Sequence, residues 1–476
     1  MSAPDAVRPV ARPVDAPPRP GRPGPAVPRG DLGALRRAVA DGIVEEVVVA
    51  VPDLQGRLQG SRIDAGHALA EVLVPGGGFG ACDYLLAVDV DMRTDGGYAI
   101  DADDRGFGDL TLRPDPDSLC LPPWWDRTAL VIADAVDHAG ARVDVAPRSV
   151  LRRQLERLAD LGLTARCGTE LEFVVFDESP ARAHERGYRD LTPASRHNAD
   201  YGLLATAGIE HLTRRIRRAL GDCGLRLETA RGECHPGQYE IVFRHEEALR
   251  ACDDAALLKL AAKAIAGQEG RALTFMARVD EGEGSSCHVH VSLADREGRP
   301  AFAAEGTEMP DLLRHALAGQ LACLGDFALL WAPTTNSYKR LQPGTFAPDA
   351  AAWGWDNRLA ALRIAGHGAG RRIEHRVAGA DANPYLVVAG IAAAAVHGIE
   401  HGLEPGDPVA GPPGPDAPPL PRDLAEALAR WQRSPLVRDA FGADVQRHLA
   451  RAAAVELDLS RRAVTDWERR RLFERI

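Results

Sequence analysis

The sequence has little of what marks a nucleic-acid-binding protein. Its 57 lysines and arginines are outnumbered by 68 aspartates and glutamates, which leaves a net charge of −11. A phosphate backbone requires a basic face, and no basic tract interleaved with aromatic side chains is present. We therefore expect no nucleic-acid partner.

Cysteine is scarce and unpaired along the chain. Eight cysteines are scattered over 476 residues, with no Cys-x-x-Cys pair and no spacing typical of a zinc site or a disulfide framework. No signal peptide is evident, so we expect a cytoplasmic protein whose thiols fill core space. The longest apolar runs, such as residues 387–396, are too short to cross a bilayer, and we expect no membrane association.

Residues 1–30 differ in composition from the rest of the chain. They are dominated by proline, arginine, alanine and glycine. Such a segment buries too little apolar surface to offset the entropy lost on ordering, so we predict a disordered tail.

Two folded units are expected beyond this tail. Residues 31–142 predict a small strand-rich domain that opens with a helix after Asp31 and continues with a strand over residues 43–51. Residues 143–476 predict a larger unit, which begins with a helix at Pro147 and then alternates strands with helices.

The most informative segment is residues 168–176, whose β-branched and aromatic content predicts a strand. Alternate residues of a strand face the same side, so Glu170 and Glu172 point one way and Leu171 and Phe173 the other. Adjacent carboxylates repel each other unless a cation lies between them. For a single such pair, the polar side of an edge strand is the commoner explanation.

A second segment repeats this pattern. Residues 233–243 place Glu233 and Glu240 beside a strand, although their spacing would send them to opposite faces of an unbroken one. A turn or bulge at Pro236 and Gly237 can bring both carboxylates to one side.

Two further strands carry polar faces. In residues 287–293, one face holds His288, His290 and Ser292. A lone strand histidine is more often a core or surface residue than a ligand, but a pair on a polar face favours a site.

In residues 371–377, Arg372, Glu374 and Arg376 share a face. Taken alone, this pattern slightly favours an ordinary ladder of ion pairs over a site.

Together these strands predict one site for hard cations and phosphate. Carboxylate-rich sets with little nitrogen and no sulfur suit Mg²⁺ or Mn²⁺, and arginines hold phosphate oxygens bidentately. Phosphoryl transfer from ATP needs both, although neither a Walker A loop nor a kinase signature is present. The candidate metal ligands are Glu170, Glu172, Glu233, Glu240, His288 and Glu374.

From about Val47 to the C-terminus, the chain resembles glutamine synthetases. The resemblance rests on an ordered series of motifs: residues 168–173, 233–241 (with Pro-Gly-Gln-x-Glu), 284–293, 336–341, 357–358, 371–376 and 382–386. It implies an α+β fold, with a β-grasp N-terminal domain and a catalytic domain built on a curved antiparallel sheet, or open barrel, flanked by helices. It also implies a homo-oligomer of stacked rings (a dodecamer), in which a neighbour's N-terminal domain completes each site.

The resemblance also implies roles for the site residues. Two to three Mg²⁺ or Mn²⁺ ions are expected per site. One would be held by Glu172, Glu233 and Glu240, and a second, on the ATP phosphates, by Glu170, His288 and Glu374. Arg340 and Arg358 would be catalytic. Glutamate would contact Gly284, Arg340 and Arg376, and ATP would contact His290, Ser292, Arg358, Arg363 and Arg372.

The implied chemistry has two steps. The γ-carboxylate of glutamate attacks the γ-phosphate of ATP to give γ-glutamyl phosphate. An uncharged amine then attacks the acyl carbon and expels phosphate, while the protein contributes positioning and charge neutralisation.

The sequence departs from the ammonia-using enzymes where ammonium would bind. Their flap carries a glutamate where this chain has Phe346, which cannot accept a proton, and Glu283 stands where they have asparagine. The aspartate that deprotonates ammonium has only Asp83 as a weak match. Phe346 is therefore assigned to an amine pocket, and these departures favour the γ-glutamylamide branch of the family.

Several acceptors and one inactive role are compatible with the sequence. Ethanolamine is favoured and a polyamine is the alternative, because residues 56–60, 84–89 and 232–234 look most like the family members that glutamylate ethanolamine. Ammonium, as in an ordinary glutamate–ammonia ligase, is disfavoured by Phe346. A ring-forming structural or regulatory relative without activity is disfavoured because all six candidate metal ligands are present.

Overall fold

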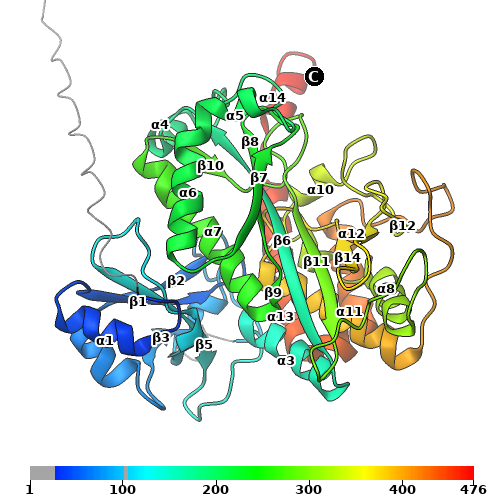
Figure 1. Ribbon diagram of the computed structural model, residues 1–476. Coiled ribbons are helices and arrows are strands. Elements are labelled where there is room, and N and C mark those ends of the chain that lie inside the picture. The colour runs from blue at the N-terminus through cyan, green and yellow to red at the C-terminus, as the bar shows by residue number, and fades with distance from the viewer. Residues whose placement is uncertain (1–26, 101–105) are drawn as a thin grey trace, which may run out of the picture.

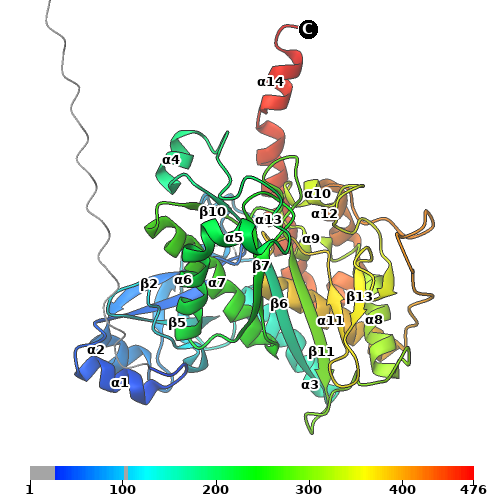
Figure 2. The same cartoon turned by 45° about the horizontal axis from the view of Figure 1, so that its top comes forward.

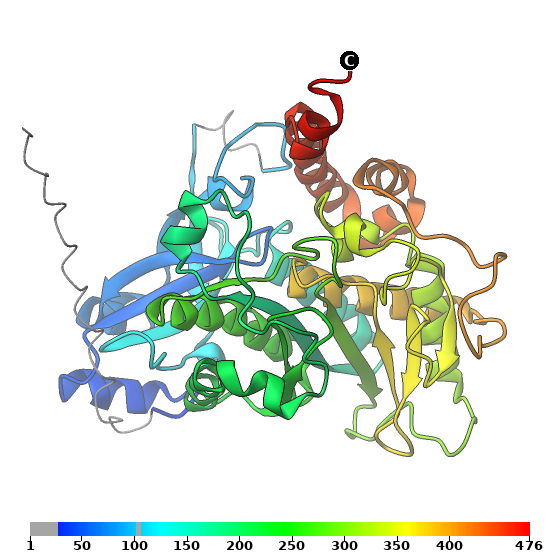
Figure 3. The ribbon, with the colours of Figure 1, turned by 90° about the horizontal axis from the view of Figure 1, so that it is seen from above.

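The computed structural model describes residues 27–100 and 106–476. Two sheets organise these residues, a five-stranded sheet near the N-terminus and a nine-stranded sheet that carries most of the remaining chain. Figure 1 shows the N-terminal sheet in blue beside the helices that cover the larger sheet. Seen from above in Figure 3, the N-terminal sheet and the yellow strands near residue 350 lie on opposite sides of the molecule.

The N-terminal sheet has the order β2-β1-β5-β4-β3. Its strands β1 and β5 are parallel, and its other neighbouring pairs are antiparallel. The strands are β1 (Glu46–Pro52), β2 (Leu58–Asp64), β3 (Phe79–Cys82), β4 (Asp109–Pro114) and β5 (Thr128–Val136). Short helical segments connect them: α2 (Ala65–His67), η1 (Ala68–Val72), η2 (Asp83–Leu86) and η3 (Pro116–Ser118).

Strand β1 is buried on both faces. Val47 and Val49 pack into a core that includes Leu35 of α1 (Leu32–Ala40), whereas Val48 and Ala50 pack into the main core of the molecule. The N-terminal sheet is therefore covered by its own helix on one side and by the rest of the chain on the other.

The first helix begins as predicted, because the Asp31 carboxylate accepts a hydrogen bond from the Ala34 amide at 2.7 Å. The folded part starts earlier than expected, however. Val27 is buried, the Arg29 guanidinium pairs with Asp254, and the Gly30 amide donates to the Leu119 carbonyl at 3.0 Å. Residues 27–30 thus belong to the packed structure, and residues 1–26 of the predicted tail lie outside the described residues.

The large sheet has the order β12-β13-β14-β11-β6-β8-β7, with β9 and β10 also paired to β6. All its pairs are antiparallel except β12 with β13. The predicted α+β fold is confirmed. The strands are β6 (Thr164–Phe176), β7 (Leu227–Gly232), β8 (Gln238–Phe243), β9 (Glu246–Glu247), β10 (Ala272–Thr274), β11 (Cys287–Ala294), β12 (Trp353–Trp355), β13 (Leu362–Ala365) and β14 (Arg372–His375).

Helices connect and follow these strands. They are α3 (Pro147–Asp160), α4 (Pro180–Glu185), α5 (Leu203–Thr206), η4 (Ala207–Ile209), α6 (Glu210–Asp222), α7 (Ala248–Gln268), α8 (Asp311–Cys323), α9 (Ala328–Trp331), α10 (Ser337–Arg340), α11 (Pro384–His401), α12 (Leu424–Arg433), α13 (Pro435–Arg462) and α14 (Asp466–Leu472). Within the described ranges, no helix combines the length and apolar character that a membrane crossing needs.

Helix α11 lies at the centre of these helices and packs against α3, α7 and α8. It is apolar around most of its circumference, as expected for a buried helix. Its approach to α8 depends on glycine, because a Cβ on Gly398 would lie 2.0 Å from the His315 carbonyl oxygen.

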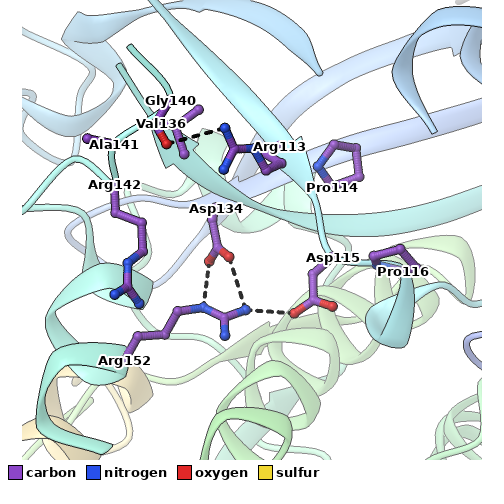
Figure 4. A pocket seen from close by; sticks show the side chains of 10 residues that line it. All are labelled: Arg113, Pro114, Asp115, Pro116, Asp134, Val136, Gly140, Ala141, Arg142 and Arg152. Carbon is purple, nitrogen blue, oxygen red and sulfur yellow. Dashed lines mark hydrogen bonds and ion pairs between the residues drawn. The ribbon is translucent and has the colours of Figure 1, made fainter. Parts of the chain in front are cut away.

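A buried arginine ties the N-terminal sheet to helices α3 and α7. Arg148 of α3 donates to Asp253 of α7 at 2.8 and 3.1 Å, to Asp134 of β5 at 2.7 Å and to Asp115 at 2.9 Å. Arg152 continues this network at the rim of a cavity of about 530 Å³, where it contacts Asp134 and Asp115 (Figure 4). This cavity contains none of the predicted site residues.

Candidate active site

The register of strand β6 with its neighbours places carboxylates and histidines side by side. Glu170 lies directly opposite His288 of β11, and Glu172 lies directly opposite Glu240 of β8. Residues paired in this way project from the same face of a sheet. The alternation expected from the sequence therefore extends across three strands.

Two more strands extend this polar face. His290 of β11 pairs with Glu374 of β14, and Glu374 pairs in turn with Arg363 of β13. The order of the strands thus brings side chains as far apart in the sequence as Glu170 and Glu374 onto one face of the sheet.

Glu170 is the centre of a compact cluster. Its carboxylate lies 3.3 Å from Nδ1 of His288 and 2.8 Å from Nε2 of His290. Burial would raise the pKa of Glu170, but the hydrogen bonds from the two histidines lower it well below its usual range. Two groups of side chains here could each hold a metal ion: Glu170 with His290 and Glu374, and Glu170 with Glu240 and His288.

Glu374 is surrounded by arginines. Arg363 donates to its Oε2 at 2.7 Å, and Arg376 contacts its Oε1. Burial opposes ionisation, but the charge of Arg376 lowers the pKa of Glu374 to about 2. Arg372 donates to Nδ1 of His290 at 3.0 Å, which leaves the other ring nitrogen as the donor to Glu170.

Glu172 is held by neutral donors. The Ser286 amide donates to its carboxylate at 2.8 Å and the Gln238 side chain at 3.0 Å, and the Ser286 hydroxyl is also bonded to it. Glu172 is fixed in place without a guanidinium partner within the described residues.

Glu233 and Glu240 are linked by Arg231. Its guanidinium lies 2.9 Å from Oε1 of Glu233 and 2.8 Å from Oε2 of Glu240. The turn predicted at Pro236 and Gly237 is present, with Gly237 at a positive φ of 76°.

Burial and neighbouring carboxylates disfavour the ionised forms of Glu233 and Glu240. Burial, followed by the charge of Glu172, raises the pKa of Glu233 to about 7. Burial, followed by the charges of Glu170 and Glu172, raises that of Glu240 to about 9. A divalent cation would relieve this repulsion. In the part of the chain described, no single compact group unites Glu172, Glu233 and Glu240, although their charges act on one another.

Arg340 lies deep beside this face, with 4% of its surface exposed. It donates to the carbonyl oxygens of Val377 at 2.8 Å and Arg376 at 3.2 Å. Burial lowers its pKa to about 10. Gly284 packs against it so closely that a Cβ there would lie 2.7 Å from Cγ of Arg340.

The remaining predicted residues are less enclosed. Ser292 is half-buried on β11, and the Arg358 side chain is exposed while its carbonyl accepts from Arg376. Phe346 lies on a loop and is 64% exposed. Asp83 is buried near the N-terminal sheet, where its amide bonds to the Gly108 carbonyl.

Sequence reasoning missed the residues that hold the carboxylates, namely Arg231, Gln238 and Ser286. Arg231 precedes Glu233 by two residues, so both side chains face the same side of an extended strand. This spacing could have indicated that the guanidinium contacts that carboxylate. The roles of Gln238 and Ser286 depend on contacts between distant segments and left no signal in spacing.

Comparisons with known proteins identify the family of this chain. Residues 144–472 match the family model for the glutamine synthetase catalytic domain. The γ-glutamylethanolamide synthetase GlnA4 of Streptomyces coelicolor is 53% identical over 93% of this chain and 95% of its own length. A glutamate–isopropylamine ligase of a Pseudomonas species is 32% identical over 91% of this chain and 96% of its own.

Structure comparison finds the same fold in a solved structure. The ligand-free structure of GmaS superposes with a TM-score of 0.80 at 25% identity, over 93% of this chain and 99% of the other. The chain belongs to the glutamine synthetase family and is an ATP-dependent carbon–nitrogen ligase that forms γ-glutamylamides.

Proposed function

We propose that the acceptor is ethanolamine and that the protein is a γ-glutamylethanolamide synthetase. The observation that carries this proposal is the high identity, along nearly the whole chain, to an enzyme of that name. Phe346 supports it, because an aromatic residue in the flap leaves no carboxylate there for an ammonium ion. An amine with a short carbon tail can instead contact the ring.

The donor set fits Mg²⁺ or Mn²⁺. It consists of carboxylates and imidazoles without thiolates, and these are the oxygen-rich ligands that hard divalent cations prefer. We propose two to three ions per site. One would be held by Glu172, Glu233 and Glu240, and another by Glu170, His288 and Glu374, with His290 adjoining it. Bound ions would neutralise the polyphosphate of ATP.

The arginines would position the two anionic substrates. Buried Arg340 and Arg376, with the backbone of Gly284, would hold glutamate so that its γ-carboxylate meets the γ-phosphate. Arg358, whose side chain is exposed, would stabilise charge on the transferring phosphoryl group.

ATP would be bound on the opposite part of this face. The residues in contact with it would be His290, Ser292, Arg363 and Arg372. Attack of the γ-carboxylate on the γ-phosphate forms γ-glutamyl phosphate and releases ADP. Attack of the uncharged amine on the acyl carbon then forms the amide and releases phosphate.

We also propose a β-grasp N-terminal domain that ends near residue 142 and a homo-oligomer of stacked rings. An apolar surface at the C-terminus supports assembly. Helix α14 and the adjoining end of α13 project from the body (Figure 2), and Trp467 and Phe473 are 66% and 85% exposed. The eight free thiols support a cytoplasmic location.

An amine panel in a phosphate-release assay tests the acceptor. Ethanolamine, ammonium, isopropylamine and putrescine are compared at matched concentrations with ATP, glutamate and Mg²⁺, and products are identified by mass spectrometry. We expect ethanolamine to have the highest kcat/KM. Equal rates with ammonium would contradict the proposal.

A substitution at Phe346 tests whether the flap determines the preference for ethanolamine over ammonium. Phe346→Glu restores a carboxylate at this position and should raise the use of ammonium relative to ethanolamine. An unchanged ratio would show that Phe346 does not form the amine pocket.

A further inference from the structure

Glu283 lies between the flap and the hairpin that carries Glu233. The Phe346 amide donates to its Oε2 at 3.4 Å. Its loop also contacts the hairpin, because the Asp280 carboxylate lies 2.9 Å from Nε2 of His235. Glu283 is half-buried at the place where the flap and this loop meet.

The backbone before Glu283 is firmly held. Arg278 donates to three successive parts of this loop, the carbonyls of Asp280 at 3.1 Å, Glu281 at 2.8 Å and Gly282 at 3.0 Å. The Asp280 carboxylate in turn lies 2.9 Å from Nε2 of His235 on the hairpin. A recognition group is effective when its support is rigid, and this loop meets that condition.

The backbone after Glu283 is held as well. The Gly284 carbonyl accepts a hydrogen bond at 2.9 Å from Gln238, the same side chain that holds Glu172. Glu283 is therefore fixed relative to the carboxylates of the site and does not depend on a free loop.

Glu283 also differs from its acidic neighbours in charge pairing. Glu233 and Glu240 pair with Arg231, and Glu374 pairs with Arg376. Within residues 27–100 and 106–476, no lysine, arginine or histidine lies within ion-pair distance of Glu283. A half-buried carboxylate on a firmly held loop, without a cationic partner, favours binding of a cation from solution.

We propose that Glu283 binds the ammonium group of the acceptor amine as it enters, and so determines acceptor affinity. Acceptor amines arrive protonated at neutral pH, so a charge-assisted hydrogen bond to this carboxylate is available. The α-ammonium of glutamate is the other cationic group among the substrates. It is a poorer candidate because Glu283 contacts the exposed flap, whereas Gly284 packs on deeply buried Arg340. The inference rests on the proposed amine ligase activity but not on ethanolamine being the acceptor.

The test compares a charged and an uncharged acceptor in the Glu283→Gln variant. The charged one is the best primary amine of the panel, and the uncharged one is hydroxylamine, which is neutral at pH 7 and yields a hydroxamate. Loss of one charge-assisted hydrogen bond should raise KM for the primary amine about 10- to 100-fold. KM for hydroxylamine and for glutamate should change less than about 2-fold.

Glu281→Gln is the matched control, because Glu281 is an exposed residue of the same loop. Its kinetic constants should stay at the wild-type values. Equal losses with both acceptors in Glu283→Gln would indicate a structural role and overturn the proposal. A rise in the KM of glutamate would assign Glu283 to the α-ammonium and overturn it as well. Failure of the ligase proposal would instead be visible in the wild-type protein.

Discussion

Removing the charge of Arg148 should destabilise the protein strongly. This side chain is fully buried and makes four hydrogen bonds to the carboxylates of Asp253, Asp134 and Asp115. Arg148→Met keeps most of the apolar stem but leaves Asp253 with only the Tyr385 hydroxyl as a partner within this network. Breaking a buried ion pair in this way costs about 3–5 kcal/mol.

The expected shift in melting temperature follows from the size of the chain. An unfolding entropy of about 2.1 cal/mol/K per residue gives roughly 1 kcal/mol per kelvin for the whole protein. Arg148→Met should therefore lower Tm by about 4 °C in differential scanning calorimetry at fixed protein concentration. Arg152→Met is the control. Arg152 is 27% exposed, and we expect a decrease of about 1 °C or less.

A second substitution separates charge from packing. Combining Arg148→Met with Asp253→Asn removes the uncompensated charge, so the double variant should be more stable than Arg148→Met alone. The reasoning is refuted if Arg148→Met melts within 1 °C of the wild type. It is also refuted if the decrease in Tm of the double variant equals the sum of the decreases in the two single variants.

Three further predictions concern the site, pH and the N-terminus. Glu172→Gln should lower turnover more than about 100-fold without changing oligomer size in gel filtration, because it removes a proposed metal ligand and little volume; retained activity would exclude that role. Burial lowers the pKa of His448 to about 4, so the native state keeps a neutral ring while the unfolded chain binds a proton below its usual pKa near 6.5. Stability should thus fall as pH drops, and from pH 7 to pH 5 the wild type should lose about 2 kcal/mol more than His448→Gln in urea unfolding; parallel losses would contradict this. Deleting residues 1–26 should leave activity and Tm unchanged, whereas deletion through residue 30 should lower Tm because it removes the Arg29 partner of Asp254; loss of activity in the shorter deletion would show a function for the tail.

Strand periodicity made much of the site predictable. The spacing of Glu170 and Glu172, and of His288 and His290, is two residues, and a pleated strand turns this spacing into a shared face. The structure places these side chains on adjacent strands in the expected orientation. The start of α1 was also predictable, because its cap depends on side-chain and backbone groups three residues apart.

Contacts between distant segments were not predictable in the same way. The tail was expected to extend through residue 30, but Arg29 is held by Asp254, a partner more than two hundred residues away. Arg231 joins Glu233 to Glu240 only because β7 and β8 pair in one register. Composition and local spacing carry no information on such pairing.

The amino-acid sequence by itself determined the type of chemistry in this protein. It supplies carboxylates, histidines and arginines at strand spacing, and these side chains suit hard cations and phosphate whatever their arrangement. Only the tertiary structure decided which of them meet. The order of β14, β11, β6 and β8 sets every distance between Glu374, Glu170 and Glu240. That order is determined by packing of the whole core, because strand pairing depends on burial and not on local preference.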